Sequence, residues 1–148
     1  VVSIDLSDPG LIKRNIDDIS RIVRRYADIV FVNEDEARAL TGKEPEEALE
    51  EIGKNTDIAV VKLGRRGSLI KNGRKLYRIK GFKANAVDTT GAGDMYAAGI
   101  LYGLTHDYSL EKAGKLASYI AARIVEQVGA RFEGNLKKEA KKGGVLDS

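Results

Sequence analysis

The sequence has 148 residues, a formal net charge of +3, no cysteine and one histidine. This length suffices for one domain with a hydrophobic core, and 43% hydrophobic with 32% charged residues fits a globular protein. The lack of cysteine excludes disulfides, thiolate metal sites and cysteine nucleophiles, and a single histidine excludes a histidine metal cluster.

Charge and hydropathy also restrict the partners. No apolar run reaches the roughly 18 residues of a membrane span, and no signal-peptide pattern is present, so we expect a cytoplasmic chain without a membrane partner. Basic and acidic residues mostly alternate, which favours a solvated surface over nucleic-acid binding. The only histidine, His106, lies in the polar turn "THDYS" and is not expected to serve a Ser-His-Asp triad.

The first half of the chain is predicted to alternate strands and helices. Residues 1–10, "VVSIDLSDPG", have the pattern of a buried strand that ends in a polar turn, and apolar residues recur at helical spacing over 11–26. The apolar stretches 28–33 and 58–64 predict two more strands. Between them we expect a short helix over 34–42 that Gly42 closes, and a helix over 45–55 that Pro45 opens.

The second half begins with a different pattern. Two strands around Asn72-Gly73 predict a β-hairpin, because this dipeptide suits a tight hairpin turn. An apolar helix is predicted from about Asp94 to Leu104, and an amphipathic helix from Leu110 to Val128. The remaining residues are polar.

This order predicts an α/β fold, namely a three-layer α/β/α sandwich with a mainly parallel sheet plus a β-hairpin. The predicted parallel strands are apolar throughout, as expected where both faces are covered. Ligands of such sheets bind beyond the carboxyl ends of the strands. Asn33, Gly64 and the turn at 91–94 each follow a strand, so we expect them to share one rim.

The stretch "VDTTGAGDMYAAG", residues 87–99, carries the strongest signal. Gly91 and Gly93 permit positive φ and close approach of another group. The first N–H groups of the following helix lack internal partners, and the helix dipole adds positive charge, so phosphate is the expected guest. Asp94 has two interpretations: it caps the helix, or it accepts a proton from a hydroxyl that attacks the phosphate.

Four segments carry a resemblance. "DTTGAGD" with its apolar helix resembles the second signature of the PfkB (ribokinase-like) family of carbohydrate and nucleoside kinases. "NEDE" (33–36) resembles the family's Asn-x-x-Glu motif, and "KLGRRG" (62–67) resembles its Leu-Gly-x-x-Gly loop. "ASYIAARIVEQVGAR" (117–131) resembles the helix and turn beside the nucleotide. The match runs from residue 1 to about Phe132.

The resemblance implies an ATP-dependent phosphotransferase that moves the γ-phosphate of Mg·ATP to a primary hydroxyl of an adenosine-like nucleoside or a sugar. Asp94 would be the base that activates the hydroxyl. The backbone N–H groups of Gly91, Ala92 and Gly93 would stabilise the charge on the transferred phosphoryl group.

The resemblance also implies contacts to the nucleotide and its metal. Asn33 and Glu36 would help to position Mg²⁺, through water, and the phosphates; the same spacing is also that of a capping box. Gly64 and Gly67 would let the chain pass close to the nucleotide, or would simply shape a turn. Lys62 either reaches a phosphate or is a surface charge.

Three further positions extend the implied site. Asp88 and Thr90 occupy positions that resemble part of a monovalent-cation (K⁺) site of some members, although both residues also suit local turn hydrogen bonds. Many sugar kinases of the family have Asn near the adenine where this chain has Ser118. The run "SYIAARIV" resembles the adenosine-kinase branch more than ribokinase.

Family members are about twice this long. We therefore expect residues 1–132 to be the C-terminal nucleotide-binding and catalytic part of a kinase, and 133–148 to be a polar, flexible tail. Most of the substrate pocket would lie in a missing N-terminal half, which predicts a homo-oligomer or a partner half. The alternative is a non-catalytic nucleotide-binding fragment, or half of a split kinase, that is inactive alone.

Overall fold

The computed structural model describes residues 1–147. The chain divides into two compact units. The first unit comprises Val1–Gly64 and Ser68–Arg78, and the second comprises Arg65–Gly67 and the chain from Ile79 onward. Each unit is described by itself.

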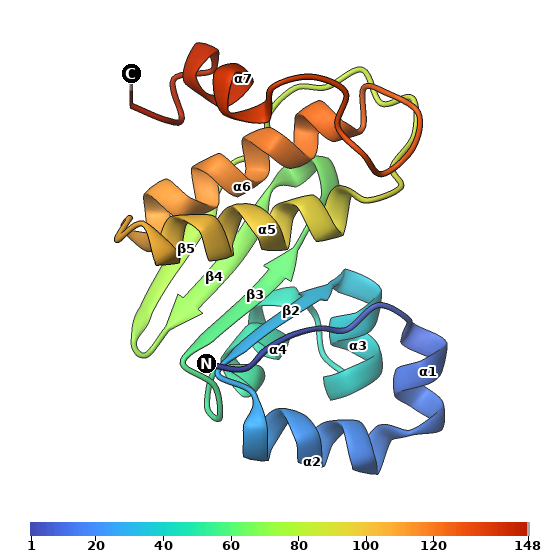
Figure 1. Ribbon diagram of the computed structural model, residues 1–148. Coiled ribbons are helices and arrows are strands. Elements are labelled where there is room, and N and C mark those ends of the chain that lie inside the picture. Colours follow the sequence, from blue (N-terminus) through green and yellow to red (C-terminus); the bar gives the residue numbers. More distant parts are fainter. Residues whose placement is uncertain (148) are drawn as a thin grey trace. The chain divides into compact units, whose positions relative to one another are not determined.

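Five strands form one sheet in the order β1-β2-β3-β4-β5 (Figure 1). β1 pairs with β2, and β2 with β3, in parallel, whereas β4 runs antiparallel to β3. β4 and β5 are the predicted hairpin, and Gly73 between them has a φ of +56°. The strands are β1 (Ser3–Asp5), β2 (Ile29–Asn33), β3 (Ile58–Lys62), β4 (Ser68–Asn72) and β5 (Lys75–Ile79).

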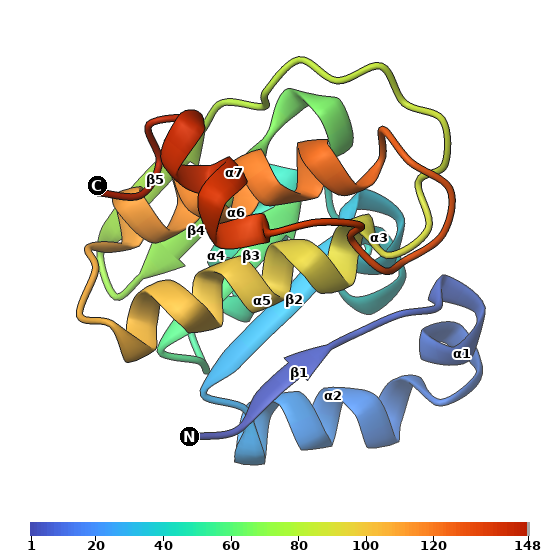
Figure 2. The same ribbon diagram turned by 45° about the horizontal axis from the view of Figure 1, so that its top comes forward.

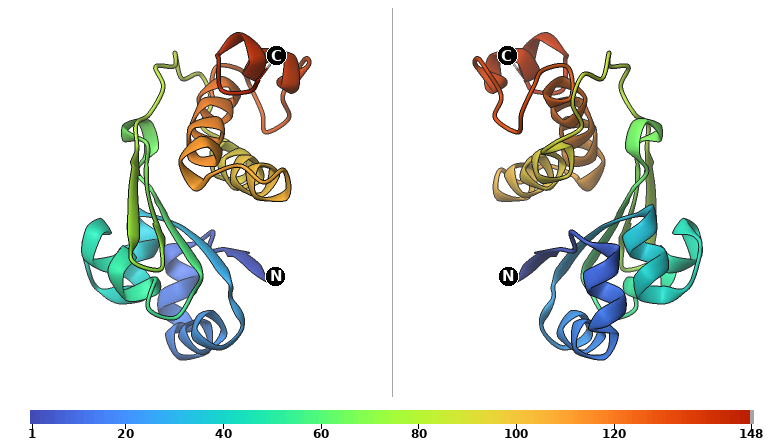
Figure 3. Two further views of the ribbon diagram at one scale, coloured as in Figure 1. Left: turned by 90° about the vertical axis from the view of Figure 1, so that its left-hand side faces the viewer. Right: turned by 90° about the vertical axis from the view of Figure 1, so that its right-hand side faces the viewer.

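Four helices belong to the first unit, and α3 and α4 lie against one face of the sheet (Figure 3). The residues of the sheet that pack against the helices are apolar and buried, among them Val30, Val32, Ala59 and Val61. Because strand residues alternate between faces, Asp5, Phe31, Asn33 and Lys62 share the opposite face. The helices are α1 (Pro9–Arg14), α2 (Ile16–Tyr26), α3 (Glu34–Thr41) and α4 (Pro45–Ile52).

The single helix predicted over residues 11–26 is wrong, because the structure has two helices that meet at Asn15. Asn15 has φ −128° and ψ 34°, outside the helical region, and its side-chain Nδ2 donates to the carbonyl of Leu11 at 3.0 Å. Such side-chain bonds to the backbone compete with helix continuation. The apolar spacing is the same on both sides of this break, which is why periodicity did not reveal it.

In the second unit, α5 (Ala92–Thr105) and α6 (Leu110–Ile124) pack side by side (Figure 2). Glycines allow the close approach: a Cβ on Gly99 would lie 2.5 Å from Cα of Ala117, and one on Gly103 would lie 2.4 Å from Cβ of Ala113. α5 begins at Ala92, before the predicted Asp94, and α6 ends at Ile124, before the predicted Val128.

The segment expected to be a polar tail contains a helix, α7 (Leu136–Lys142), that sequence analysis missed. Ala140, Val145 and Leu146 are buried together with Leu116 and Tyr119 of α6. Two lysines and two glycines separate Ala140 from Val145, so the pattern is too short to show an amphipathic face in sequence.

The predicted α/β class is confirmed, with parallel strands at the start of the sheet and a hairpin after them. Within residues 1–147, no helix has the length and apolar character needed to cross a bilayer.

Candidate active site

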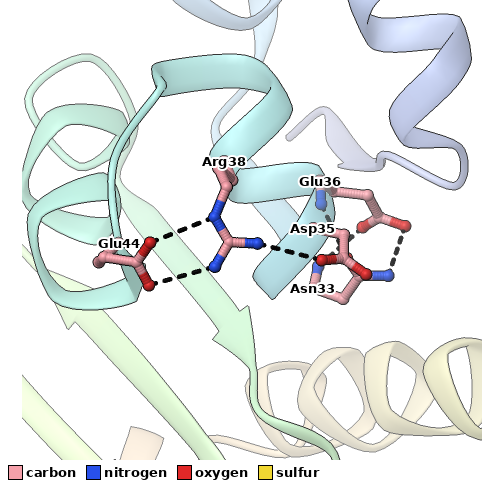
Figure 4. Close-up of polar contacts among 5 residues, drawn as sticks. All are labelled: Asn33, Asp35, Glu36, Arg38 and Glu44. Carbon is pink, nitrogen blue, oxygen red and sulfur yellow. Dashed lines mark hydrogen bonds and ion pairs between the residues drawn. The ribbon is translucent and has the colours of Figure 1, made fainter.

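The predicted site residues fall into two groups, one in each unit. In the first unit, Asn33 and Glu36 form a reciprocal capping box at the start of α3 (Figure 4). Asn33 Oδ1 accepts the Glu36 N–H at 2.8 Å, and Glu36 Oε2 accepts the Asn33 N–H at 2.7 Å. Asn33 Nδ2 also donates to Glu36 Oε1 at 2.9 Å. The capping interpretation of this motif is therefore confirmed.

Glu36 is the buried acid of this group, with only 3% of its surface exposed. Burial raises the pKa of Glu36 above its ordinary value, while the hydrogen bond from the Asn33 backbone and the nearby Lys62 act in the opposite direction. Asp5 adds to the rise. Each carboxylate oxygen accepts one hydrogen bond from Asn33 and keeps a lone pair for a further partner, such as a water molecule or a metal ion.

Lys62 is paired with an acid that sequence analysis did not single out. Its Nζ lies 2.8 Å from Oδ1 and 3.0 Å from Oδ2 of Asp5. The two side chains are only 14% and 26% exposed, so Lys62 is not a solvated surface charge. The pair spans β2, because Asp5 ends β1 and Lys62 ends β3. An acid at the end of the predicted first strand was the signal in the sequence.

The two glycines of "KLGRRG" have different surroundings. Gly64 has a φ of +60°, and a Cβ built on it would meet nothing within 4 Å. Gly67 has a φ of +97°, and its Cβ would lie 1.9 Å from the carbonyl oxygen of Ile79. Gly67 is thus required by the packing of the backbone, whereas Gly64 leaves open space beside the chain.

In the second unit, the glycine turn leaves the start of α5 without a side-chain cap. Gly91, the N-cap residue, has a φ of +80°, and a Cβ on it would lie 2.7 Å from Cβ of Ala130. The Ala92 N–H donates to the carbonyl of Thr89 at 3.2 Å. N–H groups at such an uncapped helix start, in the field of the helix dipole, attract an anion.

Asp94 lies in the first turn of α5 and is exposed. Within residues 1–147 its carboxylate takes part in no hydrogen bond or ion pair, and the N-cap position belongs to Gly91. The side chain therefore does not cap the helix through a hydrogen bond. Its remaining structural role is a favourable charge at the positive end of the helix dipole.

Asp88 joins the glycine turn to the loop that follows α6. Its Oδ1 accepts the Thr90 N–H at 2.8 Å, and its Oδ2 accepts the Gly129 N–H at 2.9 Å. The side chain of Thr90, followed by these two backbone N–H groups, lowers the pKa of Asp88 to about 2. The backbone N–H groups of Val87 and Asp88 both donate to the Val125 carbonyl, at 2.7 and 3.1 Å. The turn is thus anchored to the end of α6.

A pocket of about 570 Å³ is lined by residues 128–134, the loop that carries Gly129. On α6, the buried Ser118 donates its hydroxyl to the carbonyl of Lys80 at 3.1 Å. A second residue of α6 also bonds to the segment before the glycine turn: the Arg123 guanidinium donates to the carbonyl of Lys83 at 2.5 Å. Ser118 therefore has a structural partner already.

The fold and these motifs define an α/β protein with an uncapped helix start that follows a glycine turn. The model of the pfkB family carbohydrate kinase matches residues 4–137, and the chain belongs to this family. It is 35% identical over 127 residues to an "Uncharacterized sugar kinase" of Archaeoglobus fulgidus. The aligned region covers 84% of this chain and 50% of that protein.

Two solved structures are similar throughout. A probable sugar kinase protein from Rhizobium etli has 37% identity and a TM-score of 0.92, over 97% of this chain and 44% of its own. The adenosine kinase from Sinorhizobium meliloti has 35% identity and a TM-score of 0.90, over 95% of this chain and 44% of its own. The chain thus spans about half the length of these relatives, consistent with a C-terminal portion.

Proposed function

We propose that this chain is the nucleotide-binding and catalytic part of an ATP-dependent kinase whose acceptor is a primary hydroxyl of an adenosine-like nucleoside or a sugar. The observation that carries the proposal is Asp94, an exposed carboxylate with no bond of its own within residues 1–147, beside an uncapped helix start. A carboxylate next to an anion site would repel a bound phosphate. Its position is explained if the carboxylate acts as a base that accepts a proton from the attacking hydroxyl.

In the proposed reaction, Asp94 accepts the proton of the acceptor hydroxyl. The freed oxygen attacks the γ-phosphorus in line, a new P–O bond forms, and the bond from the γ-phosphorus to the β–γ bridging oxygen breaks. ADP leaves with the electron pair of that bond. Backbone N–H groups at the turn stabilise the charge of the transferred phosphoryl group. Gly91 and Gly93 are the better donors, because the Ala92 N–H already points to Thr89.

We assign the nucleotide to the elements that the family motifs mark. Gly64 leaves room for a close backbone approach, and the pocket at residues 128–134, in the loop that follows α6, would take the base. Lys62 is the candidate contact for a phosphate. Its ammonium can donate a third hydrogen bond in addition to the two that it makes to Asp5.

Mg²⁺ would shield the negative charge of the phosphates during transfer. The described part of the chain has no cluster of three or more histidine, aspartate or glutamate side chains that could hold a metal. This fits Mg²⁺, which keeps several waters and is bound largely by substrate phosphates. Glu36, with both oxygens held by Asn33, would hold one of those waters.

Asp88 is a candidate ligand of a monovalent cation at the glycine turn. Both carboxylate oxygens accept backbone N–H groups, from Thr90 and Gly129. Each oxygen keeps a further lone pair, so we assign any K⁺ to the Asp88 carboxylate together with backbone carbonyl oxygens of the turn, including those of Asp88 and Thr90. Dependence of activity on K⁺, compared with Na⁺ and Li⁺ at equal ionic strength, tests this assignment.

The relatives support a kinase and leave two acceptor classes. The matched proteins are described as sugar kinases and as an adenosine kinase. The run "SYIAARIV" on α6 favours the nucleoside. We therefore rank adenosine-like nucleosides first and sugars second.

The test is ADP formation from Mg·ATP with adenosine, other nucleosides, ribose and fructose phosphates as acceptors, for the wild-type chain and for Asp94→Asn. A catalytic base contributes on the order of 10²–10⁴-fold, so the variant should lose that much turnover while its nucleotide affinity changes little. The matched control is Asp107→Asn, beyond the other end of α5, which should behave as wild type. Normal turnover by Asp94→Asn would refute its role as the base.

The second candidate is a nucleotide-binding fragment, or one half of a split kinase, that is inactive alone. It is favoured by the length, because the chain spans only about half of its relatives. ATP binding by calorimetry, without ADP formation with any acceptor, would support this candidate over the first. A homo-oligomer detected by sedimentation with acceptor-dependent activity would support the first.

A further inference from the structure

The loop that lines the pocket after α6, residues 128–134, contains neither a helix nor a strand. In the described part of the chain it also takes part in no backbone-to-backbone hydrogen bond. A loop without such bonds depends on side chains for a defined shape. Asp88 and Gln127 supply them, because both side chains bond to backbone groups of this pocket loop.

Gln127 lies directly before the pocket loop and holds two of its backbone groups. Its Nε2 donates to the Arg131 carbonyl at 2.5 Å, and its Oε1 accepts the Glu133 N–H at 3.2 Å. A carbonyl can only accept and a backbone N–H can only donate, so the two bonds require a donor and an acceptor at the end of one side chain. The amide of glutamine provides both.

The other end of this clamp is fixed to α6. The Gln127 backbone N–H donates to the carbonyl of Ile124, the last residue of α6, at 3.3 Å. Ile124 is fully buried, and Gln127 itself is half-buried. Phe132 lies between the two clamped residues and belongs to the pocket lining. The side chain of Gln127 thus ties this part of the lining to the end of a packed helix.

Asp88 holds a different part of the same loop. Its carboxylate accepts the Gly129 N–H at 2.9 Å. The next residue, Ala130, packs against the glycine turn, since a Cβ on Gly91 would lie 2.7 Å from the Ala130 Cβ. The start of the pocket loop is therefore joined to the glycine turn, whereas residues 131–133 are held by Gln127.

We propose that Gln127 is a positioning residue for the nucleotide base, because it holds residues 131–133 in the shape that receives the base. This inference rests on the proposed function, in which the pocket takes the base and the glycine turn takes the phosphates. A loop that is already held in shape loses less conformational freedom on binding, so the clamp raises affinity. Gln127 acts through the loop and does not touch the reacting atoms.

The experiment compares ATP with inorganic tripolyphosphate, which has the phosphates but no base. Calorimetry measures the affinity of the 148-residue chain for each, and NMR follows amide exchange at Glu133. Gln127→Met removes both bonds at a similar side-chain length, and Gln127→Glu keeps an acceptor for the Glu133 N–H but loses the donor to Arg131. Asn135→Ala is the matched control, because Asn135 directly follows the loop but bonds to the Lys138 N–H in α7.

The two ligands should respond differently. In Gln127→Met, amide exchange at Glu133 should be roughly fivefold faster, as for the loss of one ordinary hydrogen bond. Its affinity for ATP should fall on the order of tenfold, while its affinity for tripolyphosphate stays at the wild-type value because Asp88 still holds Gly129. Gln127→Glu should lie between Gln127→Met and wild type, and Asn135→Ala should bind both ligands as wild type does.

Each contrary result has a distinct meaning. Wild-type affinity of Gln127→Met for ATP overturns the inference and leaves the proposed function intact. Equal losses for ATP and tripolyphosphate, or the same loss in Asn135→Ala, overturn it as well, because they show general loosening of the region. A wild-type chain that binds ATP no better than tripolyphosphate refutes the assignment of the base to this pocket, and the inference with it. The role of Asp94 is decided separately by acceptor-dependent ADP formation.

Discussion

Asp88 and Gly129 are joined by a hydrogen bond of 2.9 Å between the Asp88 carboxylate and the Gly129 backbone N–H. The bond connects the turn before α5 with the loop after α6. The second carboxylate oxygen accepts the Thr90 N–H within the turn itself. One side chain therefore fixes the glycine turn relative to the end of α6, within the second unit.

Asp88→Asn should loosen this connection. An amide keeps one acceptor oxygen but places its NH₂ group against a backbone N–H, so one of the two bonds is lost. A net contribution of about 1 kcal/mol for a hydrogen bond predicts roughly fivefold faster amide exchange at Gly129 or Thr90. Exchange followed by NMR checks this, with Glu133→Gln in the same loop as the control. Equal protection in Asp88→Asn and wild type would argue against the connection.

Acid should weaken the same connection. The folded-state pKa of Asp88 lies at about 2, below its ordinary 3.8, so the unfolded chain binds the proton more readily. The contribution of Asp88 to stability is thus complete above pH 3.8 and is lost as the pH falls through about 2. Wild type should lose stability more steeply than Asp88→Asn in this window, as followed by denaturant unfolding at each pH. Parallel curves would show that the carboxylate adds nothing.

Asn33→Ala should destabilise the first unit by about 2 kcal/mol. Loss of an N-cap costs roughly 1 kcal/mol, and the buried Glu36 also loses its bond from Asn33 Nδ2. Urea unfolding measures the difference. Asn135→Ala is the matched control, because Asn135 caps α7 through the Lys138 N–H without a buried acid beside it. A smaller loss for Asn33→Ala than for Asn135→Ala would contradict the role of Glu36 in the box.

Gly99→Ala should destabilise the packing of α5 on α6. The new methyl group would lie 2.5 Å from Cα of Ala117 and 2.9 Å from its Cβ, so the helices must move apart. Overpacking of this kind costs about 1–3 kcal/mol, even though alanine is the better helix former. Gly10→Ala in α1 is the control, because its nearest atoms lie at 3.1 Å and belong to the side chains of Arg14 and Asp8 rather than to a packed backbone. Thermal unfolding of both variants distinguishes the two cases.

The glycine turn and its acid could be predicted from sequence because their parts are contiguous. Gly91, Gly93 and Asp94 lie within a few residues, and their joint effect, an uncapped helix start with an acid in its first turn, is a local property. The capping box of Asn33 and Glu36 is local in the same sense, and both of its bonds were implied by the spacing.

The break at Asn15 could not be predicted in this way. The apolar residues continue at helical spacing through it, and only the bond of the Asn15 side chain to the Leu11 carbonyl shows that the helix is interrupted. The helix α7 was missed for the opposite reason. Its few apolar residues gain their burial from α6, which the sequence does not place beside them.

The sequence by itself determined the α/β class, the family and the local chemistry of the glycine turn, because propensity, periodicity and contiguous motifs need no long-range contacts. Only the tertiary structure decided the partners of the charged side chains. Lys62 meets Asp5 because parallel pairing aligns the ends of three strands, and Asp88 meets Gly129 because α5 and α6 pack as neighbours. Such pairs join residues far apart in the chain, and the distance between them is set by packing alone.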